Sequence, residues 1–246
     1  MTFPEPLKQV GIRLLRWAKA HKVKSVLLLV GAWLFVEIVA LPFGDIDRLK
    51  SANPTETAFM REHAERAKQE GKAFKRQHKW IPLSRISKDA VNAIIVAEDG
   101  TFWSHGGFDW FEFRESIERN ITEGRAARGA STITQQLVKN LYLSSSKNPF
   151  RKLKEWILTW YMEQSLSKSR ILEVYLNVIE WGRGVYGIDA ASQYYFGKSS
   201  SELSRDEAAR LAAIIPSPRR FRADQESRYV VRRSRIILER MAARGL

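Results

Sequence analysis

The segment Ile94–Asp109, IIVAEDGTFWSHGGFD, is predicted to join an apolar helix to a polar turn through an acidic pair. Apolar residues recur at helical spacing before the acidic pair, and Ser87 is the predicted N-cap of this helix. Glu98 and Asp99 end the helix, and Gly100 permits the turn that follows. The pattern predicts a carboxylate at the surface edge of a domain. The alternative is a solvated pair of helix-end charges, since most exposed carboxylates have no chemical role.

The composition is that of a folded protein with an anionic partner. The chain has 246 residues, of which 44% are hydrophobic and 28% charged, enough for one large domain or two small ones. A formal charge of +14 is compatible with nucleic acid, acidic lipid or a phosphorylated substrate. The lack of cysteine excludes disulfides and thiolate metal sites, and the four histidines are too scattered in sequence to indicate a zinc site.

An apolar run near the N-terminus predicts a membrane anchor. Residues 25–43 contain Glu37 as their only charge and would form a helix of about 28 Å, the thickness of a bilayer core. The following VALPFG lacks the small residues of a cleavage site, which favours an uncleaved anchor over a signal peptide. The basic tail, residues 1–24, precedes the run and therefore predicts a cytoplasmic N-terminus. Nucleic acid is then not expected as a partner of the exported, still basic remainder.

The remaining chain is predicted to be mainly α-helical. Residues 44–83 are interpreted as a juxtamembrane helical arm, and residues 84–246 as one compact domain without a convincing strand. A last helix is expected from about Asp224 to Arg244. The predicted N-terminal signals of the other helices are Thr132 with Gln135, Asn148 with Pro149, Ser167, and Ser204 with Glu207.

Two segments carry residues suited to anion chemistry. Residues 128–136, RGASTITQQ, lead a basic loop into a helix through hydroxyl residues, and Gln135, Gln136 and Lys139 share one helical face. A capped helix with solvated amides is the alternative. Residues 151–155, RKLKE, place Arg151 one turn from a glutamate, which forms either an ordinary surface ion pair or a cationic pocket for a pyrophosphate.

Taken in order, these segments resemble the peptidoglycan glycosyltransferases, which polymerise lipid II. Five motifs follow one another over about 90 residues without a departure at a position that the family uses, and no transpeptidase domain follows, as in the single-activity members. The matching segments are EDGTFWSHGG at 98–107, GASTITQQ at 129–136, RKLKE at 151–155, KSRILEVYLN at 168–177 and RGVYG at 183–187.

The resemblance implies a lysozyme-like, mainly helical domain behind a single transmembrane helix. It also implies roles for individual residues. Glu98 would be the general base, and Lys139, Arg151 and Lys152 would bind the pyrophosphate. Glu155 would be a second catalytic acid that positions these cations or a metal. The further substrate-binding residues implied by the motifs are Ser131, Thr132, Gln135, Gln136, Asp99, Phe102, His105 and Arg183.

The same resemblance sets the expected partners. It implies lipid II and a growing glycan strand as substrates, a divalent cation (Mg²⁺ or Mn²⁺) as the one cofactor to consider, and no organic cofactor. The domain would face the periplasm from the bacterial inner membrane, where cell-wall synthases or division proteins are candidate partners. Two alternatives stay open, a membrane-anchored lysozyme-like hydrolase or lytic transglycosylase, and a non-enzymatic module that binds anionic polymers.

Overall fold

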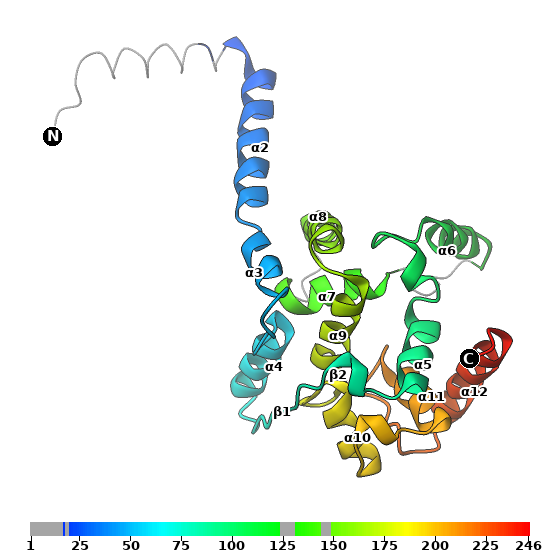
Figure 1. Cartoon of the computed structure of the whole chain (residues 1–246). Coiled ribbons are helices and arrows are strands. Elements are labelled where there is room, and N and C mark those ends of the chain that lie inside the picture. Colours follow the sequence, from blue (N-terminus) through cyan, green and yellow to red (C-terminus); the bar gives the residue numbers. More distant parts are fainter. Residues whose placement is uncertain (1–16, 18–19, 124–130, 144–148) are drawn as a thin grey trace. The chain divides into compact units, whose positions relative to one another are not determined.

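The computed structural model describes residue 17 and residues 20–123, 131–143 and 149–246 (Figure 1). The predicted cap at Asn148 and most of the basic tail lie outside the described residues, as do the first residues of the basic loop at 128–130. The chain divides into two compact units, Met1–Pro42 and Phe43–Leu246.

The first unit contains an apolar helix, α2 (Lys22–Val39), none of whose residues is buried. An 18-residue window of this region reaches a mean hydropathy of 2.4, and it is the one part of the described chain that is long and apolar enough to cross a membrane. The helix begins and ends earlier than the predicted span of residues 25–43. Its C-cap is Ala40, two residues before Pro42, because a proline disfavours helical geometry in the residue before it.

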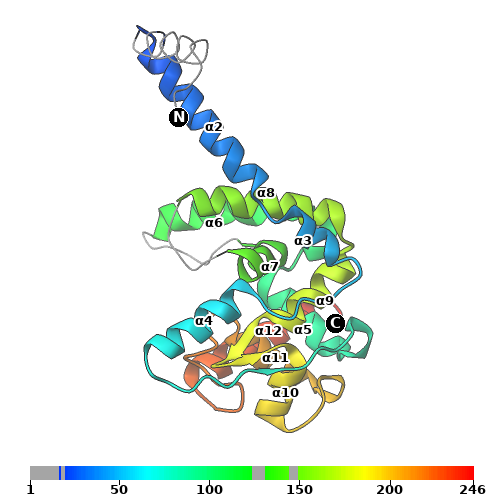
Figure 2. The same ribbon diagram turned by 90° about the vertical axis from the view of Figure 1, so that its left-hand side faces the viewer.

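The second unit consists mostly of helices, as predicted. Figures 1 and 2 place α6 and α8 on the same side of this unit, with α7 beneath them, while α10 lies on the opposite side. The α-helices are α3 (Phe43–Arg48), α4 (Ala58–Gln69), α5 (Lys88–Glu98), α6 (Trp110–Glu123), α7 (Ile133–Tyr142), α8 (Pro149–Ser165), α9 (Lys168–Val178), α10 (Ile188–Phe196), α11 (Arg205–Ile214) and α12 (Arg228–Ala243).

The core is built around two central helices. Helix α11 packs against α5 and α12, and α7 packs against α8 and α9. The alanines of α11, including Ala208, Ala209 and Ala212, are fully buried, and their small side chains let the neighbouring helices approach closely. The arm is tied to the same unit, because Arg170 of α9 donates hydrogen bonds to the carbonyls of Leu49 and Ala52.

The prediction that the domain has no strand was wrong. A three-stranded sheet has the order β1 (Gln77–His78), β3 (Val185–Tyr186), β2 (Glu180–Gly182), with β1 parallel and β2 antiparallel to β3. Strands of two or three residues are too short to show alternation in the sequence. The turn between β2 and β3 requires Gly184, which has φ +77° and whose Cβ would lie 2.5 Å from the carbonyl oxygen of Lys75.

Most of the predicted helix starts were confirmed. Thr132 and Ser204 each form a complete capping box, and Ser167 caps α9. Ser87 is the N-cap residue of α5, as predicted, but its hydroxyl donates to the carbonyl oxygen of Leu203 and does not cap the helix. The last helix begins after Ser227, not near residue 224.

Candidate active site

Glu98 is the last residue of α5, and two other helices hold its carboxylate. Gln136 of α7 donates from Nε2 to Oε2 at 3.0 Å, and Arg233 of α12 donates to Oε1 at 3.2 Å. The Glu98 side chain is 9% exposed. The acidic residue at the edge of α5 is thus held in a defined position and is not a freely solvated helix-end charge.

A buried tyrosine fixes the orientation of the Gln136 amide. The hydroxyl of Tyr175 in α9 donates to Oε1 of Gln136 at 2.9 Å. Burial raises the pKa of Tyr175 well above its ordinary value, so its hydroxyl stays protonated and acts as a donor. With Oε1 engaged in this way, the amide must turn its NH₂ group toward Glu98.

Arg233 is a site residue that sequence reasoning missed. It lies 135 positions after Glu98, in a helix with several other arginines, so no local signal distinguishes it. Its side chain is 12% exposed, and its Nε atom is buried without a hydrogen-bond partner among the described residues. The guanidinium is therefore directed into the interior next to Glu98, not into solvent.

Glu98 opens onto a cavity of about 630 Å³. Of the predicted substrate-binding residues, Ser131, Gln136 and Lys139 line it together with Glu98. The motif at 98–107 and the motif at 129–136 therefore meet at this cavity. Besides Asn140 of α7 and Ile179 at the end of α9, the rest of the lining comes from α4, from β2 and from the loop that follows α11. Sequence reasoning had assigned none of these three segments to the site.

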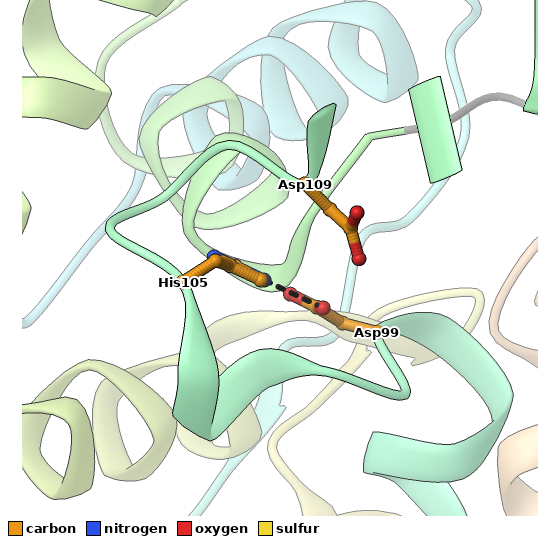
Figure 3. A group of neighbouring side chains, drawn as sticks. All are labelled: Asp99, His105 and Asp109. Carbon is orange, nitrogen blue, oxygen red and sulfur yellow. Dashed lines mark hydrogen bonds and ion pairs between the residues drawn. The ribbon is translucent and has the colours of Figure 1, made fainter. Parts of the chain in front are cut away.

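Asp99 and His105 form an internal brace behind Glu98 (Figure 3). His105 Nε2 lies 2.8 Å from Asp99 Oδ1, while Asp99 Oδ2 accepts the backbone N–H of Ile133, the first residue of α7. His105 Nδ1 accepts the backbone N–H of Gly107, which leaves the ring proton on Nε2. The brace joins the turn after α5 to the start of α7 and thereby fixes Glu98 relative to Gln136.

This brace does not fit a resident divalent cation. Ligand atoms of Asp99, His105 and Asp109 lie within 4.8 Å of one another, the spacing of a possible metal cluster. However, the protonated Nε2 of His105 has no lone pair to offer, which leaves two carboxylates as ligands, and the Asp109 oxygens already accept hydrogen bonds from the Thr101 hydroxyl and the Glu112 backbone. These hydrogen bonds outweigh the effect of burial and lower the pKa of Asp109.

Three other predicted residues belong to the framework. Phe102 is fully buried, and Gln135 completes the capping box of α7 with its side chain. The Thr132 hydroxyl donates to the carbonyl oxygen of Gly107. Arg183 is exposed in the turn between β2 and β3 and does not line the cavity.

A second carboxylate, Glu155 of α8, lies within a group of cations. It is 4% exposed at its side chain, and Arg151 donates to Oε2 at 3.2 Å while Lys152 bonds to Oε1. Lys139 of α7 interacts electrostatically with Glu155, Arg151 and Lys152. Burial is the main cause that lowers the pKa of Lys139, and the Glu155 carboxylate acts in the opposite direction. The Nε atom of Arg151 is buried without a partner among the described residues. Three cations around one carboxylate leave a net positive site for an anion.

The surface next to this cationic group is unusually apolar. Helices α6 and α8 and the turn before α6 expose large hydrophobic side chains, a concentration typical of a lipid or protein contact. The exposed residues are Trp103, Trp110, Phe111, Phe113, Phe150, Leu153, Trp156 and Trp160.

Comparison with known proteins identifies the family of this chain. The family model described as Transglycosylase matches residues 64–242. A protein of Chromobacterium violaceum named biosynthetic peptidoglycan transglycosylase is 43% identical over 219 residues, which cover 89% of this chain and 95% of the relative. Proteins of the same name from Methylobacillus flagellatus (46% identical; 77% of this chain, 82% of the relative) and Nitrosospira multiformis (41%; 90% and 93%) are also similar.

Proposed function

This chain belongs to the transglycosylase family and is a peptidoglycan glycosyltransferase, and we propose that Glu98 is its general base. The observation that carries this assignment is the shared cavity, which brings the Glu98 carboxylate and the Lys139 ammonium to the same space. A base and a cation are the two groups that sugar transfer from a pyrophosphate requires.

In the proposed reaction, Glu98 takes the proton from the 4-hydroxyl of the acceptor sugar of lipid II. The freed oxygen forms a bond with the anomeric carbon of the growing strand, and the bond from that carbon to the pyrophosphate breaks. Undecaprenyl pyrophosphate leaves, and the α-linkage becomes a β-1,4 linkage in a single displacement with inversion. Gln136 and Arg233 hold the carboxylate in place while the proton moves.

The leaving pyrophosphate is assigned to the cations of α7 and α8. Arg151 and Lys152 bond to Glu155, whose carboxylate holds their side chains in place, and Lys139 lies within electrostatic reach of all three. A pyrophosphate needs neutralisation of its negative charge more than it needs a proton donor. Glu155 is therefore proposed to position cations, and a divalent cation, Mg²⁺ or Mn²⁺, is proposed to accompany the pyrophosphate of the substrate and not to reside in the brace.

The cation group also separates this proposal from the lytic alternative. A lysozyme-like enzyme must protonate a sugar oxygen and therefore needs a carboxylic acid that keeps its proton. Both oxygens of Glu155 accept hydrogen bonds from Arg151 and Lys152, and both oxygens of Glu98 accept them from Gln136 and Arg233. Neither carboxylate is placed to serve as the proton donor.

The exposed apolar side chains of α6 and α8 support a lipid-linked substrate. We propose that this face meets the outer surface of the bacterial inner membrane, where the undecaprenyl chain of the substrate resides. The basic flank before α2 supports a cytoplasmic N-terminus and a periplasmic catalytic domain. Cell-wall synthases and division proteins remain proposed partners.

The deciding experiment supplies the purified full chain with lipid II and, separately, with preformed glycan strands, and analyses the products on a gel. We expect a ladder of polymer from lipid II and no shortening of preformed glycan. Shortening of the preformed strands without polymer formation would favour the lytic enzyme.

A further inference from the structure

We propose that Phe59 and His63 of α4 form a saccharide-binding wall that holds the sugar rings next to the pyrophosphate of the growing strand. The inference rests on the proposed function, which it deepens. Both residues line the Glu98 cavity, yet both precede residue 64, where the match to the family model begins. The wall is thus supplied by the arm and not by the matched part of the chain.

Phe59 connects this wall to the cationic end of the cavity. The Nζ atom of Lys139 lies 5.9 Å from the centroid of the Phe59 ring. A pyrophosphate held by Lys139 therefore places its attached sugar within reach of Phe59. Sugar rings present C–H groups on their faces, and the negative face of an aromatic ring attracts such groups.

His63 continues the wall one helical turn further. It follows Phe59 at a spacing of four residues on the same face of α4, and the two ring centroids are 5.9 Å apart with a tilt of 51°. An aromatic ring and an imidazole at this separation can contact one pyranose ring or two successive ones.

His63 offers a neutral N–H donor to the cavity. Its Nδ1 atom lies 2.8 Å from the hydroxyl oxygen of Tyr186. Burial raises the pKa of Tyr186, which keeps that hydroxyl protonated, and burial also lowers the pKa of His63, which keeps the imidazole neutral. A neutral imidazole carries one ring N–H, and this proton is on Nε2 when Nδ1 accepts from the Tyr186 hydroxyl. Such a donor suits the hydroxyl or N-acetyl oxygens of an amino sugar.

Two charged residues next to His63, Arg219 and Glu180, pair with each other and so offer a ligand no net charge, while the third, Arg220, lies over the Phe221 ring. Arg219 donates to both oxygens of Glu180, at 2.8 and 3.0 Å, and both residues line the cavity. An anion here would have to compete with the Glu180 carboxylate for Arg219. The cavity volume of about 630 Å³ lies in the usual range of sites for ligands of this size.

The test uses the full chain in detergent and chitotetraose, a neutral β-1,4-linked tetramer of N-acetylglucosamine that has no pyrophosphate. Binding is measured by calorimetry for the wild type, Phe59→Ala and His63→Phe, with Glu65→Ala at an exposed position of α4 as the matched control. We expect each cavity variant to weaken binding about 3- to 10-fold, the size of one neutral hydrogen bond or aromatic contact. The control should bind like the wild type, and His63→Gln, which keeps an N–H donor, should recover part of the loss.

Polymerisation kinetics provide the second readout. Phe59→Ala and His63→Phe should raise KM during strand elongation and leave kcat within about twofold, because the wall binds the substrate and takes no part in the proton transfer. The proposed saccharide-binding wall would be wrong if both variants kept wild-type affinity and KM. It would also be wrong if Glu65→Ala lost as much affinity for chitotetraose, or if the wild type did not bind chitotetraose. The proposed function fails separately, if Glu98→Gln still polymerises lipid II.

Discussion

Glu98 and Glu155 are two carboxylates with similar burial and different surroundings. Their side chains are 9% and 4% exposed. Glu98 lies at the edge of a cavity and meets an amide from α7 and a guanidinium from α12, whereas both oxygens of Glu155 are engaged by cations of its own helix. Burial therefore does not distinguish a base from a positioning residue.

The difference matches the two roles proposed for these carboxylates. A general base must be ionised and must reach a substrate proton, which the open cavity beside Glu98 allows. Both oxygens of Glu155 are engaged by Arg151 and Lys152, and Glu155 does not line the cavity, so it is not placed to reach a substrate proton. It can instead orient the cations for a pyrophosphate. The following predictions test this division of roles.

The sharpest test is Glu98→Gln, which keeps the shape and removes the ability to take a proton. We expect polymerisation to fall by about 10²- to 10⁴-fold, the usual contribution of general-base catalysis, with thermal stability and lipid II binding close to wild type. Glu155→Gln is the matched control and should lose activity together with substrate affinity. A Glu98→Gln enzyme that keeps more than a few per cent of the wild-type rate would remove Glu98 as the base.

The cations around Glu155 should have the next largest effect. Arg151→Ala or Lys152→Ala should cost about 2–4 kcal/mol of transition-state stabilisation, or about 30- to 900-fold in kcat/KM for lipid II. The fold should be less affected than activity, because each single variant leaves the buried Glu155 carboxylate with one of its two cations. Lys154→Ala, on the same helix, is the control. Unchanged polymerisation in both variants would mean that Arg151 and Lys152 form only ordinary ion pairs with Glu155.

Substitution of Arg233 should lower the catalytic rate, which depends on Glu98, more than it weakens substrate binding. Arg233→Gln should lower kcat about 13- to 160-fold, the size of a lost charged hydrogen bond of about 1.5–3 kcal/mol, while lipid II binding changes little. Arg233→Lys should restore part of the rate because it keeps the charge. Arg232→Gln, at the exposed neighbouring position, should behave like the wild type. An equal effect of the two glutamine variants on kcat would contradict a specific contact with Glu98.

The smallest effect is expected from Tyr175→Phe, which removes only the hydroxyl that orients Gln136. Loss of one neutral hydrogen bond, about 0.5–1.5 kcal/mol, should lower kcat about 2- to 13-fold, and thermal denaturation should show a comparably small loss of stability. A full wild-type kcat would mean that the Gln136 amide keeps its orientation without the tyrosine.

Much of the helical fold could be predicted from the sequence because its signals are local. A capping box joins residues three positions apart, so Thr132 and Ser204 were recognisable as helix starts. The apolar run of α2 and the glutamates at the end of α5 and within α8 were equally visible. The short strands were not, because two or three residues carry no periodic pattern.

The sequence by itself determined the chemical types at the site, an acid at 98, amides at 135 and 136 and cations at 139, 151 and 152. Only the tertiary structure decided which of them meet. In the tertiary structure the Gln136 amide donates to the Glu98 carboxylate, whereas the Gln135 side chain caps the start of α7. The tertiary structure also brought in Arg233 and His63, which gave no local signal, because their contacts depend on packing between helices far apart in the chain.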